Sequence, residues 1–266
     1  MTPEDHARAA ADLLQAEASG TQIGLLTKQF PEMGMDDAYA IQNAIYRAKL
    51  EQGRSVVGWK IGLTSKAMQS ALNIDIPDSG ILFDDMVFAD GAVVPKGRFI
   101  QPRIETEIAF VLKSAIGGAD VSRDDVLAAT DYVAPALEIL DTRILRADPE
   151  TGQTRKVFDT ISDNAANAGV VLGAQRHKVD AFDLRWVGAI TSRNDEVEET
   201  GLGAGVLNDP VESVVWLARR MAQYGQSLAP GQIILSGSFI RPVECPSGSR
   251  ITADFADFGS VSVSFE

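Results

Sequence analysis

The chain has 266 residues, of which 45% are hydrophobic, so it can bury one sizeable core and is not expected to be disordered. A formal net charge of -13 would repel a polyanion, and no basic stretch alternates with aromatic residues, so nucleic acid is excluded as an expected partner. The lone Cys245 excludes an internal disulfide. The sequence has no long apolar run and does not begin like a secretory signal peptide, so we expect a cytoplasmic protein without a membrane partner.

Three helices are predicted from capping residues and apolar periodicity. Thr2 is a suitable N-cap and Pro3 fits a first turn, so one helix should begin at the N-terminus. Apolar residues at helical spacing predict a second helix from about residue 36 to 52 and a third from about residue 209 to 224. Two of these helices lie at the front of the chain.

Most of the remaining chain has the composition of short β-strands. Helices do not alternate with these strands, which disfavours a doubly wound parallel sheet. We therefore predict an α+β protein, with a helical N-terminal part over residues 1–53 and a β-rich domain, a β-roll or sandwich, over residues 54–266. The expected strands span residues 56–63, 104–112, 133–140, 170–172, 184–190, 232–235 and 261–265.

The expected strand at residues 104–112 carries two glutamates on one face. Side chains alternate along a strand, so Glu105 and Glu107 share a face with the apolar Ala109, and their Cα atoms should lie roughly 7 Å apart. An acid-x-acid strand is commonly a solvated face. The alternative is that a cation neutralises the two carboxylates.

Glu138 interrupts an apolar run that is typical of a buried strand. A buried carboxylate costs several kcal/mol unless it is paired or binds a cation, and pairing with Arg143 is one alternative. Joined with Glu105 and Glu107, it would form an all-oxygen site without histidine. Hard cations such as Mg²⁺ or Mn²⁺ prefer such a site, and zinc does not.

Lys60 lies in the middle of another apolar strand, on the side occupied by Gly58 and Gly62. Glycines at these positions leave room for a ligand or another chain segment. Lys60 is therefore a candidate for binding a carboxylate or, if burial lowers its pKa, for acid/base catalysis. The alternative is a lysine whose stem covers apolar surface while its ammonium reaches water.

Three further polar residues are candidates for the site. Asp78 follows Pro77 in a turn-like segment, where it is either a catalytic carboxylate or only the capping residue of the turn. Ser162 and Ser238 lie in polar loops next to expected strands, where hydroxyl and backbone N–H groups could bind an anionic substrate, although loops of this composition are common.

Six segments together resemble the hydratase and decarboxylase branch of the fumarylacetoacetate hydrolase superfamily, and the resemblance covers almost the whole chain. The segments are GWKIGLTSKAMQ, PDSGILFDDM, RIETEIAFVL, PALEILDTRI, KVFDTISDNAANAGVVLG and GQIILSGSF. The resemblance implies a mixed β-roll and a homo-oligomer. It also implies magnesium or manganese held by Glu105, Glu107 and Glu138, in an active site containing Lys60 and Asp78.

The activity that this resemblance implies is metal-dependent hydration of a small dienoate, 2-hydroxyhepta-2,4-dienedioate, to 4-hydroxy-2-oxoheptanedioate. Lys60 and Asp78 would then act as a coupled acid/base pair. Hydration of 2-hydroxypenta-2,4-dienoate and decarboxylation of 4-oxalocrotonate remain alternatives within the family, and a noncatalytic partner subunit is an alternative of another class. A basic residue facing the far end of the substrate would favour the diacid, and Arg143, Arg155 and Lys156 are candidates.

Overall fold

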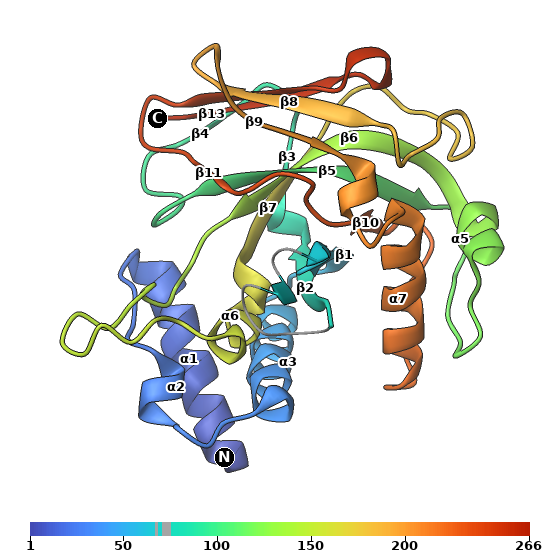
Figure 1. The fold of residues 1–266 in the computed structure, drawn as a ribbon. Coiled ribbons are helices and arrows are strands. Elements are labelled where there is room, and N and C mark those ends of the chain that lie inside the picture. Colours follow the sequence, from blue (N-terminus) through green and yellow to red (C-terminus); the bar gives the residue numbers. More distant parts are fainter. Residues whose placement is uncertain (67–68, 71–75) are drawn as a thin grey trace.

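The computed structural model describes residues 1–66, 69–70 and 76–266, and its helices form two groups (Figure 1). Residues 67 and 68 of the segment that begins at Gly58 lie outside this description. The first group is α1 (Pro3–Ser19), α2 (Leu26–Gln29), α3 (Met35–Glu51) and α6 (Val157–Ser162); the second is α5 (Arg123–Ala129) and α7 (Pro210–Ala222). The three predicted helices correspond to α1, α3 and α7, and the helical N-terminal part is confirmed.

A mixed sheet forms the larger of two β-layers. The edge strand β2 contacts β7 near the opposite edge, so the sheet curls into a roll. In order across the sheet, the strands are β2 (Asp78–Phe83), β1 (Val56–Gly62), β10 (Ile233–Leu235), β5 (Arg103–Leu112), β6 (Thr130–Leu140), β7 (Asn167–Leu172) and β3 (Val87–Phe88), and β11 (Val243–Glu244) also pairs with β5. The α+β fold class is thereby confirmed.

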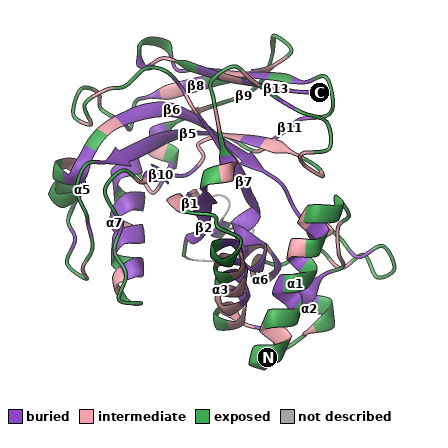
Figure 2. Ribbon diagram, turned by 180° about the vertical axis from the view of Figure 1, so that it is seen from behind, coloured by how far each residue is buried: buried purple, intermediate pink, exposed green. Residues whose placement is uncertain are grey.

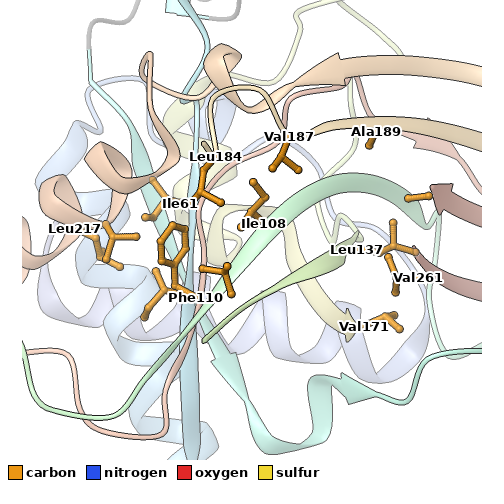
Figure 3. Packing of buried hydrophobic residues seen from close by; sticks show 14 of the residues in the cluster. Ile61, Ile108, Phe110, Leu137, Val171, Leu184, Val187, Ala189, Leu217 and Val261 are labelled. Atoms are coloured by element: carbon orange, nitrogen blue, oxygen red, sulfur yellow. The ribbon is translucent and has the colours of Figure 1, made fainter. Parts of the chain in front are cut away.

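A second sheet covers one face of the roll, on the side away from the N-terminal helices (Figure 1). Its strands are β4 (Ala92–Val94), β13 (Ser260–Phe265), β12 (Arg250–Asp254), β8 (Gly188–Arg193) and β9 (Glu196–Leu202). The main apolar core fills the space between the sheets and extends to α7, with Ile108, Leu137 and Val261 in its centre (Figure 3). In Figure 2 the inner strands β5 and β6 are correspondingly almost entirely buried.

The two faces of β5 enter different environments, as strand alternation predicts. Ile108 and Phe110 belong to the core between the sheets. Ala109 and Val111 belong to a separate apolar cluster inside the roll. The face that carries Glu107 therefore points to the interior of the roll.

The predicted strand at residues 184–190 is wrong in its first half, because β8 begins only at Gly188. Leu184 and Val187 are buried, but they reach the core from a turn in which the Trp186 N–H donates to the Asp183 carbonyl at 2.9 Å. Apolar residues in a turn that packs on the core resemble a short strand in sequence. Among the described residues, no helix combines the length and apolarity needed to span a membrane.

Candidate active site

Three glutamates meet inside the roll. Glu105 and Glu138 lie directly opposite each other on the antiparallel strands β5 and β6, and Glu107 lies two residues further along the same face of β5. One carboxylate oxygen from each of the three lies within 4.8 Å of the others. The strand register therefore brings Glu138 next to Glu105 and Glu107, although the sequence separates it from both by more than thirty positions.

The carboxylates have too few hydrogen-bond donors around them. Glu107 Oε2 accepts the Gly237 N–H at 2.7 Å, but Glu107 Oε1 and both oxygens of Glu138 accept no hydrogen bond from a described residue, although both side chains are fully buried. Burial raises the pKa of all three carboxyls, that of Glu105 to about 7, and in Glu105 and Glu107 the neighbouring Glu138 adds to the rise. Orphaned oxygens with no nitrogen or sulfur among them fit a hard divalent cation.

Lys60 faces this cluster from β1, with its Nζ atom 3.4 Å from Glu138 Oε1 and its side chain 4% exposed. The flanking glycines clear space in two different ways. A Cβ atom at Gly58 would lie 1.9 Å from the Ile233 carbonyl oxygen of β10, and one at Gly62 would lie 2.2 Å from Asp78 Oδ1 and 3.0 Å from Lys60 Nζ. Gly58 thus allows the strand pairing that holds Lys60, and Gly62 leaves room for both the Asp78 carboxylate and the Lys60 ammonium.

The pKa of Lys60 is raised, not lowered. Burial alone would lower it, but the negative charges of Glu138 and Asp78 outweigh burial. The alternative of a lysine whose pKa is lowered by burial is therefore wrong for the metal-free site. In the metal-free site Lys60 is therefore protonated, and it must donate a proton before it can accept one.

Asp78 is the first residue of β2 and pairs with Gly62 of β1, so it does not serve as the cap of a turn. Its carboxyl is buried, and Oδ1 accepts no hydrogen bond from the part of the chain that the structure describes. Burial raises the pKa of Asp78, and Lys60 opposes the rise. A carboxyl and an ammonium therefore lie next to the three glutamates, and both can exchange protons with a bound molecule.

The candidate serines have different surroundings. Ser162 ends α6, and its buried hydroxyl has no hydrogen-bond partner among the described residues. The Ser238 hydroxyl is engaged in a local turn, donating to the Ile240 carbonyl at 2.9 Å and accepting the Ile240 N–H at 3.2 Å. Ser236, in the same polar loop as Ser238, has a buried hydroxyl without a described partner beside Gly237, the residue that donates to Glu107. The substrate-binding roles of Ser162 and Ser238 stay predictions.

Comparison with known proteins identifies the family. No protein-family model matches the chain. It is 51% identical over 260 residues to the 2-oxo-hept-4-ene-1,7-dioate hydratase of Escherichia coli, covering 98% of this chain and 97% of that protein. The solved structure of 4-oxalocrotonate decarboxylase from Pseudomonas putida G7, complexed with magnesium and adipate, is 34% identical, with a TM-score of 0.93 over 100% of this chain and 99% of that one. The chain belongs to the hydratase and decarboxylase family of the fumarylacetoacetate hydrolase superfamily.

Membership in this hydratase and decarboxylase family also identifies the chain as an enzyme. A second relative, the 2-keto-4-pentenoate hydratase of Paraburkholderia xenovorans (strain LB400), is 42% identical over 266 residues, which cover 100% of this chain and 97% of that protein. The resemblance carried by the six sequence segments is thus confirmed, and so is hydro-lyase activity.

The raised carboxyl pKa values predict that the metal-free enzyme loses stability as the pH rises. A carboxyl whose pKa is higher in the folded chain than in the unfolded chain binds more protons when folded. The free energy of unfolding therefore falls as the pH rises from the unfolded pKa to the folded pKa. For Glu105 this window runs from 4.5 to about 7. Between about pH 5 and pH 8 we expect the Tm of metal-free enzyme to fall by roughly 5 °C more than that of magnesium-loaded enzyme. Calorimetry checks this, and parallel curves would contradict it.

Proposed function

We propose that the enzyme hydrates 2-hydroxyhepta-2,4-dienedioate to 4-hydroxy-2-oxoheptanedioate. The observation that carries the proposal is the meeting of three carboxylates with Lys60 and Asp78 inside the roll, in a chain 51% identical to a hydratase named for this seven-carbon diacid. Catalysis then needs one group that stabilises charge on the substrate oxygen and others that move protons.

Glu105, Glu107 and Glu138 are proposed to hold a divalent cation, magnesium or manganese. Glu107 Oε1 and both oxygens of Glu138 accept no hydrogen bond from a described residue, and the similar 4-oxalocrotonate decarboxylase was solved with magnesium. When bound, the cation supplies Lewis-acid stabilisation of negative charge on the substrate's C2 oxygen. Manganese is included because it prefers the same oxygen donors.

Lys60 and Asp78 are proposed to move the protons. Loss of the proton from the C2 hydroxyl and delivery of one to C5 convert the dienol into a conjugated ketone, whose C4 is electrophilic. Water then adds across the C3–C4 double bond of this ketone, with its hydroxyl at C4 and a proton at C3. Water is therefore the only reagent consumed. The protonated Lys60 can donate a proton, and Asp78, whose pKa burial raises, can accept and return one.

Two rival activities use the same groups. The five-carbon monoacid hydratase needs the same proton transfers, and a decarboxylase would use the same charge stabilisation for the dienolate left after loss of carbon dioxide. The relatives include proteins named for each activity. Identity to the diacid hydratase, 51% against 42% and 36%, is what favours hydration of the diacid.

An ultraviolet assay with the purified chain tests the proposal. The seven-carbon and five-carbon dienoates and 4-oxalocrotonate are each supplied with magnesium, and the products are identified by mass. We expect the diacid to gain the mass of water with kcat/KM at least about tenfold above that of the monoacid, since a lost charged contact costs more than this. Release of carbon dioxide, a preference for the monoacid, or turnover only with another protein added would each contradict the proposal.

We also propose that the enzyme acts in the cytoplasm in homoprotocatechuate degradation, as a homo-oligomer. Support for self-association comes from large apolar side chains exposed around the β8–β9 hairpin, where Trp186 is 73% and Val197 63% exposed. Contiguous exposed apolar surface is typical of contact sites between chains. Light scattering should give a molar mass that is a multiple of 28.5 kDa.

A further inference from the structure

Arg103 is the first residue of β5 and lies two positions before Glu105 on the same face of the strand. It pairs with Leu140 of β6, two steps beyond the pair formed by Glu105 and Glu138 in the strand register. Its guanidinium is partly buried, and its Nε atom is buried without a hydrogen-bond partner in the described chain. A cation thus lies beside the carboxylate cluster, at the strand end that leads out of the roll.

The acidic residues around Arg103 are engaged elsewhere. Glu244, directly opposite it on β11, forms an ion pair with Arg146 at 2.6 Å. Asp141 accepts two backbone N–H groups, at 2.9 and 2.8 Å. Glu105 belongs to the carboxylate cluster. Arg103 therefore has no ion pair within the residues that the structure describes, although a partly buried guanidinium is costly to leave unpaired.

A second partly buried guanidinium lies close to the first. Arg155 donates to the Ile144 carbonyl at 3.4 Å, while its acidic neighbour Asp163 is bound by Arg143 at 2.5 Å. Burial lowers the pKa of Arg155, and the positive charge of Arg103 lowers it further. Arg103 and Arg155, which have no acidic partner among the described residues, thus place positive charge next to the negatively charged carboxylate cluster.

We propose that Arg103, assisted by Arg155, binds the distal carboxylate of the diacid and so selects a seven-carbon substrate. This inference rests on the proposed function and names its specificity-determining residue. An extended chain from C1 to C7 spans about 7.5 Å, because each of its six bonds of about 1.5 Å advances about 1.25 Å along the zigzag, while residues i and i+2 of a strand lie about 7 Å apart. A diacid with C1 at the carboxylate cluster is therefore long enough for C7 to reach Arg103, whose planar guanidinium can bind a carboxylate through two parallel hydrogen bonds.

Replacement of Arg103 by glutamine tests the proposal through the difference between two substrates. With the diacid, kcat/KM should fall about a hundredfold, mainly through KM, because the distal charge is bound alike in ground and transition states. With the five-carbon monoacid, kcat/KM should change less than about threefold. R103K should lie between, because lysine keeps the charge without the fork. The control R241Q removes an arginine that is 82% exposed and should leave both substrates unaffected.

A measurement of ligand binding tests the role of Arg103 independently of whether the proposed reaction takes place. Magnesium-loaded wild-type enzyme should be stabilised against heat by the diacid adipate more than by hexanoate, and R103Q should lose this difference. Equal losses with both substrates, or an unchanged preference for adipate, would overturn the role of Arg103. If wild-type enzyme does not hydrate the diacid, the proposed function fails, and the adipate comparison alone decides on Arg103.

Discussion

Removal of the divalent cation should abolish turnover of the dienoate, and magnesium or manganese should restore it. The three glutamates that would hold the ion lie within 4.8 Å of one another and leave three buried oxygens without hydrogen bonds from described residues. Without the cation, the described groups that offset this negative charge are the Lys60 ammonium, the Gly237 N–H and, for Glu105, the Arg103 guanidinium, and none of them supplies Lewis-acid stabilisation to the substrate oxygen. Assay after dialysis against a chelator checks the expectation. Full activity of enzyme shown by elemental analysis to be free of metal would contradict it.

The variant E138Q separates metal binding from folding. It keeps the volume of the side chain and removes one charge, so magnesium affinity measured by calorimetry should fall by about a hundredfold or more, since changes outside the direct ligands already cost 10–100-fold. The metal-free variant should fold as well as wild type, because a buried carboxyl with a raised pKa is replaced by a neutral group. The control E150Q alters a glutamate that is 82% exposed. Unchanged affinity in E138Q would show that Glu138 is not a ligand.

The strands that carry the metal candidates could be predicted because both are long and patterned. Alternation along β5 placed Glu105 and Glu107 on one face and Ile108 on the other, and the structure gives these faces to the roll interior and the intersheet core. Glu138 was recognisable as a charge within an apolar run. Their mutual distance was not predictable from these patterns, because it depends on the register between β5 and β6.

Other parts of the site depend on backbone conformations that residue type does not suggest. Asn164, Ala165 and Ala166 all have positive φ angles, between 52° and 59°, in the turn that follows Ser162. Alanine rarely adopts this conformation, so the sequence predicts only a loop. The turn is held by tertiary contacts, since the Asn164 side chain accepts the Ile81 N–H and donates to the Ile81 carbonyl of β2.

Arg103 and the unpaired hydroxyl of Ser236 could not be singled out from the sequence for a related reason. Each has an ordinary residue type for its position, and what distinguishes each is a buried polar atom without a described partner, which only packing can show. The pKa of Lys60 is a similar case. Burial was foreseeable from its apolar strand, but the opposing charges of Glu138 and Asp78 come from other strands of the roll.

Replacement of Lys60 by methionine should lower kcat by about a hundredfold or more, the usual scale for losing a positioned proton-transfer group. Methionine roughly preserves the apolar stem, while the ammonium that it lacks lies 3.4 Å from Glu138 and faces Asp78. We expect K60M to fold and to bind magnesium, because the carboxylates keep their strands. Steady-state kinetics and metal titration check the two halves of this prediction.

The control for Lys60 is a second buried lysine. Lys49 pairs with Glu17 at 2.8 Å and is 8% exposed, so K49M removes a buried ammonium of the same kind from outside the site. It should lower the free energy of unfolding, because it leaves Glu17 unpaired, without changing kcat per folded molecule. If K60M raised KM at unchanged kcat, Lys60 would anchor a carboxylate; near-normal values of both would remove it from the chemistry. If K60M lowers kcat and K49M does not, proton transfer is the role that remains for Lys60, because burial and ion pairing are common to both lysines.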